Sequence, residues 1–90
     1  MKIIKIIYKK LGREKIWGQS TGLGIIEMDI RLKGKKHLEI CLHEMLHELF
    51  PKETEISVTQ KAIIMTNTIW GEMYRRLDKD SDVLLQDGSK

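Results

Sequence analysis

An H-E-x-x-H run from His43 to His47 places two imidazoles four residues apart, with the carboxyl of Glu44 beside the first. The run lies within residues 37–50, which favour a helix. Residues four apart on a helix are separated by about 6 Å along the axis and about 40° around it. Both rings can therefore hold one Zn²⁺, and Glu44 can act as general base on the water that the metal activates.

A catalytic zinc needs a third protein ligand and one open position. Residues 51–54 form a short connection, so the next helix must fold back antiparallel and bring its first turn close to His47. Glu55 in that turn is the first choice for the third ligand, and Glu53 is the second. An acid in a first helical turn is also favoured by the helix dipole without any metal, which is the alternative for Glu55.

Other residues near the run are weaker candidates. His37 lies six residues before His43, on the wrong side of the helix, and Asp29 could reach the site only if its strand face turns toward it. Glu48, one step past the second imidazole, is expected to be an ordinary surface acid. Cys41 points about 200° away from His43, so we interpret it as a small buried apolar residue.

The same residue types suggest how a peptide would be cleaved. Glu44 would take a proton from water and pass it to the leaving amine, unless it is simply a solvated acid on the helix surface. Tyr74 is the candidate for stabilising the oxyanion, by residue type alone. Residues 24–32 precede the metal helix and could pair with an extended peptide if they form a free sheet edge; the alternative is an interior strand.

The elements that must position these residues begin with three predicted strands, at residues 2–10, 14–20 and 24–32. The third alternates well: Ile26, Met28, Ile30 and Leu32 share one face, and Glu27, Asp29 and Arg31 share the other. This alternation favours a half-buried antiparallel strand.

Two predicted helices follow the strands. Pro51 ends the first, and Thr54 is the predicted N-cap of a second that runs to Leu77. Its apolar series is Val58, Ala62, Met65, Ile69, Met73 and Leu77. The order predicts an α+β fold, a small antiparallel three-stranded sheet followed by two antiparallel helices, in a single domain of residues 1–77 with a flexible tail at 78–90.

Composition narrows the class of protein. Ninety residues allow one small domain, which a bound metal would help to stabilise. The single cysteine allows no intramolecular disulfide, which suits a cytoplasmic protein. The apolar run at the N-terminus is too short for a signal peptide, and no stretch is long enough to span a membrane.

Charge is unevenly spread along the chain. Residues 1–36 carry ten Lys and Arg against three acids, a net of +7, and residues 37–90 carry six against ten, a net of −4. A basic half is compatible with nucleic-acid binding. We favour the alternative that lysines cover the open face and edges of a small sheet, because no nucleic-acid-binding motif accompanies the charge.

The segment LEICLHEMLHELFPKETEISV, followed by TIWGEMYRRL, resembles short H-E-x-x-H proteins of bacteriophages and prophages. These are minimal gluzincin-like metallopeptidases, distantly similar to SprT-like and repressor-cleaving phage enzymes. The matching positions are His43, Glu44, Leu46, His47, Phe50, Pro51, Thr54, Glu55, Val58, Ile69, Trp70, Tyr74, Arg75 and Arg76. The resemblance covers about residues 24–77. It implies a zincin-like fold, zinc held by His43, His47 and Glu55, Glu44 as base, and a role inside an infected bacterial cell.

The sequence is compatible with three functions. The leading hypothesis is a zinc-dependent hydrolase with one Zn²⁺ per chain, acting on peptides or proteins. The second is a catalytically inactive, metal-stabilised module that binds another protein. The third is a nucleic-acid-binding protein that uses the basic residues 1–36. The sequence leaves the oligomeric state open.

Overall fold

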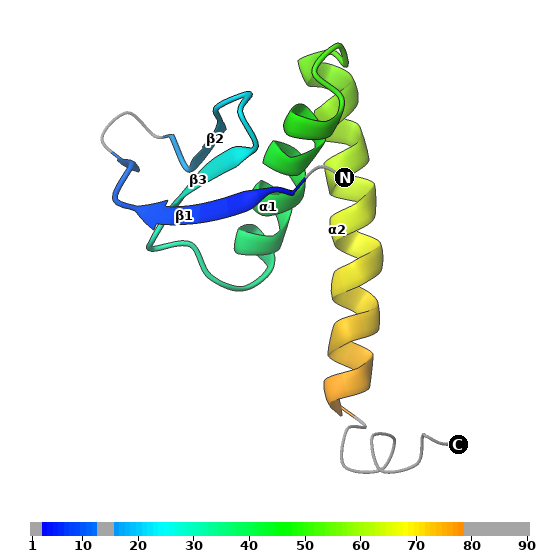
Figure 1. Ribbon diagram of the computed structural model, residues 1–90. Helices are drawn as coiled ribbons and strands as arrows, with labels where there is room; N and C mark the ends of the chain where they lie inside the picture. The colour runs from blue at the N-terminus through cyan, green and yellow to red at the C-terminus, as the bar shows by residue number, and fades with distance from the viewer. Residues whose placement is uncertain (1–2, 13–15, 79–90) are drawn as a thin grey trace.

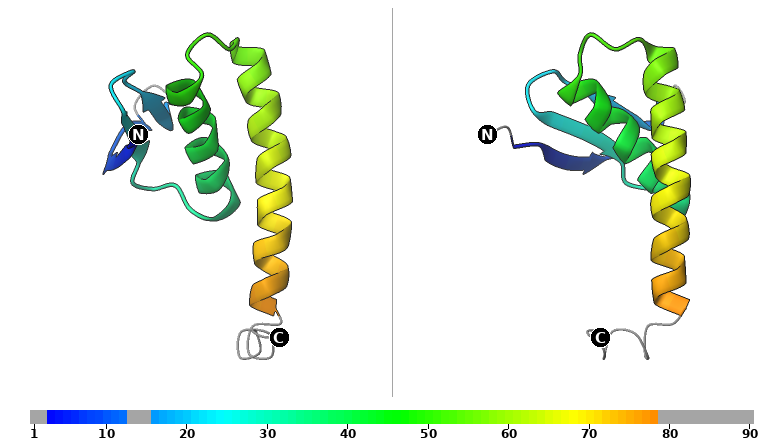
Figure 2. Two further views of the ribbon diagram at one scale, coloured as in Figure 1. Left: turned by 45° about the vertical axis from the view of Figure 1, so that its right-hand side comes forward. Right: turned by 90° about the vertical axis from the view of Figure 1, so that its right-hand side faces the viewer.

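The computed structural model describes residues 3–12 and 16–78, with side chains up to residue 73. Three layers follow one another: a small sheet, helix α1 (Gly34–Leu49) packed on one face of that sheet, and helix α2 (Glu55–Asp78) on the far side of α1 (Figures 1 and 2). The two helices run antiparallel, and α2 extends well beyond its shorter partner. The predicted α+β arrangement, with both helices after the sheet, is confirmed.

The sheet consists of β1 (Lys5–Lys9), β2 (Gly18–Ser20) and β3 (Ile25–Asp29), in the order β1-β3-β2. Strands β2 and β3 pair antiparallel, as predicted, but β1 and β3 pair in parallel. The prediction of a wholly antiparallel sheet is therefore wrong in this detail. Parallel neighbours need a connection of about a dozen residues or more, and the segment from residue 10 to 24, with β2 inside it, supplies that length.

Strand β3 keeps its predicted alternation only to its end. Ile26 and Met28 are fully buried against α1, but Ile30 is 61% exposed rather than buried. The reason is Asp29, whose buried carboxylate accepts hydrogen bonds from the backbone N–H of Leu11, Gly12 and Arg31. These bonds turn the chain at residue 30, so the period of two does not continue.

Helix α2 begins as predicted. The Thr54 hydroxyl accepts a hydrogen bond from the backbone N–H of Ser57 at 3.1 Å, which is the N-cap interaction that the sequence suggested. The helix extends to Asp78, the first residue of the predicted tail at 78–90, and the rest of that predicted tail lies outside the described residues. Within the described chain, no helix is both long enough and apolar enough to cross a membrane.

The apolar core lies on two sides of α1. Leu42 and Leu46 pack against Val58 and Ala62 of α2, while the sheet-facing cluster contains Ile26, Met28 and Leu32. Each such aliphatic side chain stabilises the fold by about 1.5–3 kcal/mol when fully buried. After Ala62, the next buried side chain on α2 is Thr66. Met65 and Met73, which were predicted to lie in the core, are 37% and 49% exposed.

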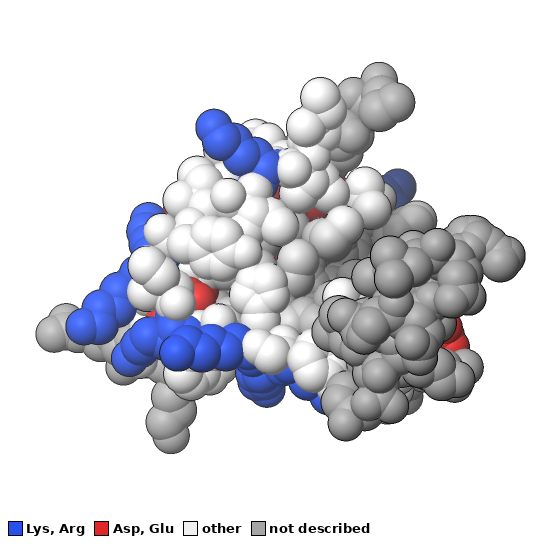
Figure 3. Space-filling view, turned by 90° about the horizontal axis from the view of Figure 1, so that it is seen from below, with Lys and Arg blue, Asp and Glu red and all other residues white. Residues whose placement is uncertain are grey.

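Basic side chains gather at the end of the molecule where α1 starts. The parallel register aligns Lys9 with Asp29, so β1 and β3 finish together, and α1 begins a few residues later at Gly34. Figure 3, which looks toward this end from below, shows Lys and Arg side chains spread over its described surface with little carboxylate between them. The H-E-x-x-H run lies toward the opposite end of α1.

Candidate metal centre

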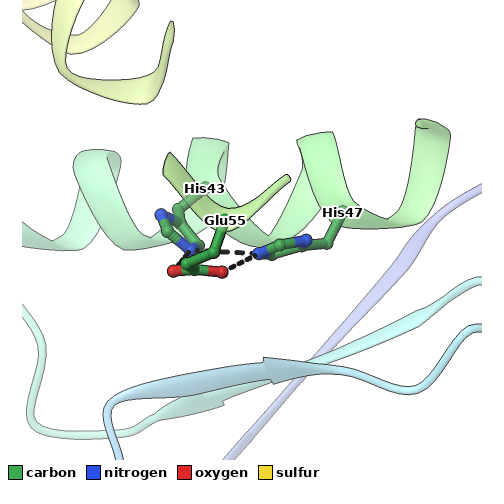
Figure 4. A group of neighbouring side chains, drawn as sticks. All are labelled: His43, His47 and Glu55. Carbon is green, nitrogen blue, oxygen red and sulfur yellow. Dashed lines mark hydrogen bonds and ion pairs between the residues drawn. The ribbon is translucent and has the colours of Figure 1, made fainter. Parts of the chain in front are cut away.

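Three side chains converge where α1 ends and α2 begins. The Nε2 atoms of His43 and His47 are 3.2 Å apart, and they lie 3.0 and 2.8 Å, respectively, from the two carboxylate oxygens of Glu55. Figure 4 shows both rings pointing at the same carboxylate. Among the described residues, this is a group that could hold a metal ion, formed by the three residues that the sequence ranked first.

With the Glu55 carboxyl ionised, no arrangement of protons on the two rings satisfies all three contacts. Each Nε2 carries at most one hydrogen. If both nitrogens are protonated, both can donate to Glu55, but then two donors face each other between His43 and His47. If either is unprotonated, its lone pair faces the carboxylate oxygen, and two acceptors oppose each other. A cation that accepts all three lone pairs removes this conflict.

The separations between the donor atoms are close to those around a small tetrahedral cation such as zinc. Ligand atoms about 2.0–2.1 Å from a tetrahedral metal lie roughly 3.3 Å apart along each edge. The separations of 3.2, 3.0 and 2.8 Å between the donor atoms of His43, His47 and Glu55 are slightly shorter than these edges. Two neutral imidazoles and one carboxylate form a donor set used by catalytic zinc, with a fourth position left open.

The fold explains why Glu55 rather than Glu53 completes the group. Pro51 follows α1, and the short connection returns the chain so that Glu55 occupies the first turn of α2. Glu53 lies before that turn and accepts hydrogen bonds from Ser57 Oγ and Lys61 Nζ instead. These bonds lower the pKa of Glu53 and fix the start of α2, so Glu53 serves the helix rather than the metal group.

The weaker candidates lie elsewhere. His37 Nε2 is 2.9 Å from the hydroxyl of Tyr8, at the other end of α1. Asp29 is fully buried, and its carboxylate already accepts hydrogen bonds from neighbouring residues. The hydrogen bonds from Arg31 hold the pKa of this carboxyl well below its usual range. Cys41 is half-buried against the sheet-facing cluster, with its Sγ 3.9 Å from Met45 Sδ, and burial raises the pKa of its thiol.

Glu44 lines the same open cavity as the three donors, a space of about 450 Å³. It is largely buried between α1 and the sheet, with 9% of its surface exposed. Burial raises the pKa of its carboxyl, and the adjacent His43 and His47 partly oppose this shift. A carboxylate with a raised pKa holds a transferred proton more readily, which suits a general base.

The opposite wall of the cavity comes from β2 and the turn that follows it. Gly18, Gln19, Ser20, Thr21 and Gly22 line it. Strand β3, considered above as a peptide-binding edge, is instead the central strand, because β1 and β2 cover both of its edges. The edge nearest the metal group therefore belongs to β2. At three residues, this strand was too short for its role to be recognised from hydrophobic periodicity.

Close approach of β2 to α1 depends on a glycine. A Cβ atom at Gly18 would lie 2.6 Å from Ile40 Cγ2 and 3.3 Å from Glu44 Cγ. Without a side chain at this position, the strand can lie directly against the helix turn that carries the proposed base. The sequence contains the glycine but gives no sign that it faces α1.

The structure bears differently on the sequence predictions for Glu48 and Tyr74. Glu48 is not a surface acid: it is 2% exposed and bonded to the β2–β3 turn. The signal was available, because Glu44 and Glu48 are four residues apart and share a helix face. Tyr74 lies in α2 by its backbone, but its side chain is outside the described residues, so its assignment as an oxyanion donor stays a prediction.

No family model, curated protein or solved structure matches this chain.

Proposed function

We propose that this protein is a small zinc-dependent peptidase that binds one Zn²⁺ per chain, of the gluzincin-like type that its sequence resembles. The observation that carries the proposal is the convergence of His43, His47 and Glu55 on one point. Supporting it is the position of Glu44 in the same cavity, one residue along α1 from the first imidazole. Zinc bound there would supply a Lewis acid that lowers the pKa of water and polarises the substrate carbonyl.

The protein's own groups would then divide the remaining work. Glu44 takes the proton of the attacking water and delivers it to the leaving amine nitrogen. Its carboxyl, largely buried between α1 and β2, has a pKa raised by that burial, which favours holding the proton between the two transfers. Glu55, in the first turn of α2, would complete the donor set with the two imidazoles.

The substrate would lie along β2 in an extended conformation. One edge of β2 pairs with β3, and among the described strands none pairs with the other edge. A peptide can add to such an edge through main-chain hydrogen bonds, which recognise backbone rather than sequence. The cavity between β2 and the donors would then receive the scissile bond.

Metal content tests the centre first. Zinc measured by elemental analysis of purified protein should be close to one equivalent in wild type and close to none in His47→Ala. His37→Ala is the matched control, since it removes an imidazole from the same helix, one that contacts the Tyr8 hydroxyl at the end remote from the three donors. Equal zinc in wild type and His47→Ala would disprove the assignment.

Turnover tests the reaction. Glu44→Gln should keep zinc but lose roughly 10²–10⁴-fold in kcat, the usual contribution of a positioned acid–base group. Peptide libraries and unfolded proteins are suitable substrates. Zinc binding that stabilises the fold without cleavage of any of them would instead favour a metal-stabilised protein-binding module.

A further inference from the structure

A second buried carboxylate lies directly beside the metal group and has no part in the reaction described above. Glu48 follows His47 on α1, and its side chain points toward the sheet. Its Oε1 accepts a hydrogen bond from the backbone N–H of Gly24 at 2.9 Å. Its Oε2 accepts two more, from the backbone N–H of Gly22 at 2.6 Å and from Ser20 Oγ at 2.5 Å.

These three bonds hold one specific loop conformation. Gly22 and Gly24 have φ angles of 82° and 85°, which side chains other than hydrogen rarely allow. The two N–H groups converge on the carboxylate because both glycines adopt this left-handed geometry. Hydrogen bonds to a charged acceptor are stronger than neutral ones, and burial strengthens them further.

The loop held in this way is a wall of the metal cavity. Ser20 ends β2, and Gly22 follows it in the turn; both line the cavity together with His47. Because Glu48 is adjacent to His47 in the chain, its hydrogen bonds tie the helix turn that carries His47 directly to this wall.

We propose that Glu48 is a positioning residue that sets the substrate-binding rim of the site, by fixing the end of β2 and the β2–β3 turn at a defined distance from the metal ligands. The inference rests on the proposed function, since it assigns the rim to an extended peptide. In this role Glu48 acts through the Ser20 hydroxyl and the backbone N–H groups of Gly22 and Gly24, not on the reacting atoms.

Amide hydrogen exchange followed residue by residue tests the clamp without any substrate. In Glu48→Gln, one acceptor oxygen and the negative charge are lost, so the Gly22 and Gly24 amides should exchange about tenfold faster or more. Glu39→Gln is the matched control, the same change at a half-exposed position on the same helix. Equal exchange of both glycine amides in wild type and Glu48→Gln would overturn the proposal.

Kinetics tests the rim itself. Glu48→Gln should raise KM for an extended peptide by about tenfold while changing kcat less than about threefold, because binding is lost equally from substrate and transition state. Zinc affinity, measured by chelator competition, should stay within about threefold of wild type. Faster exchange with unchanged KM would overturn the proposal, since Glu48 would then serve the fold alone.

A milder variant guards against loss of folding. Ser20→Ala removes one of the three hydrogen bonds and leaves Glu48 in place, so it should show the same changes at smaller size. The proposed function can fail separately: a chain that binds zinc but cleaves nothing would still show accelerated exchange in both variants. A chain that cleaves peptides with KM indifferent to both variants would keep the proposed function and remove Glu48 from it.

Discussion

The two ends of α1 each carry histidine, and they use it differently. Near the start of the helix, His37 meets one partner, the Tyr8 hydroxyl, in a contact that a single proton satisfies. Near the other end, His43 and His47 meet each other and Glu55 in three contacts that no set of ring protons satisfies together while the Glu55 carboxyl is ionised. The first arrangement is complete by itself, and the second is one that could hold a cation.

The two ends of α1 also differ in the charged residues around them. The start of α1 is rich in lysine and has no acid in its first turn. The other end brings together Glu44, Glu48 and Glu55 from two helices. Negative charge concentrated there favours a bound cation, whereas lysines at the start keep that surface hydrated. The presence of a histidine therefore does not by itself indicate a metal site. The number of partners that each Nε2 atom contacts distinguishes the two ends of α1.

Glu55→Gln is expected to have the largest effect on this contrast. It keeps the size of the side chain but removes the charge that would face the metal, so zinc affinity should fall by more than about 100-fold, beyond the usual loss of an outer-shell partner. Glu53→Gln, two residues earlier, should change it little, because Glu53 bonds to Ser57 and Lys61. Similar losses in both variants, measured by chelator competition, would erase the distinction.

Gly18→Ala tests the approach of β2 to the metal end. The added Cβ would meet Ile40 and Glu44, so unfolding free energy should drop by about 1–3 kcal/mol, as for other overpacked sites, and turnover should fall. Gly71→Ala is the matched control: it adds a Cβ where nothing lies within 4 Å and should stabilise α2 by up to about 1 kcal/mol. Urea unfolding gives both values. Unchanged stability in Gly18→Ala would show that β2 moves freely.

Asp29→Asn tests the basic end. Because hydrogen bonds from Arg31 depress the folded-state pKa of Asp29, its ionised form stabilises the fold above its ordinary value of 3.8, and this stabilisation is lost as pH falls toward the folded-state pKa. In zinc-free protein, Asp29→Asn should lower Tm at neutral pH and flatten its decline in acid. Glu27→Gln, a surface partner of Lys9, should do much less. Parallel Tm profiles for wild type and Asp29→Asn would contradict this.

Substitution of Lys33, Lys35 and Lys36 by Gln should have the smallest effect. These lysines lie at the helix end remote from the donors, so zinc affinity should be unchanged and stability should shift by less than about 0.5 kcal/mol per residue. The same variant tests the nucleic-acid alternative by fluorescence anisotropy at low ionic strength. Salt-sensitive binding of DNA or RNA by wild type, lost in this variant, would assign a second function to the basic end.

Much of the candidate site could be predicted from local sequence patterns. The four-residue spacing of His43 and His47 needs only helical geometry, and the Thr54 cap needs only the residue types at a helix start. The placement of Glu55 followed from one further constraint, the shortness of the connection between the helices. Each of these depends on residues close in the chain, where backbone geometry leaves few alternatives.

Contacts between segments far apart in the chain could not be predicted from such local patterns. The parallel pairing of β1 with β3, the enclosure of Asp29 by Leu11 and Gly12, and the bonds from Glu48 to the β2–β3 turn all join segments well separated in the chain. The sequence by itself determined which side chains could serve as ligands and base, because helical spacing is a local property. Only the tertiary structure decided which strand forms the wall facing them, because sheet order depends on how the whole chain buries its apolar surface.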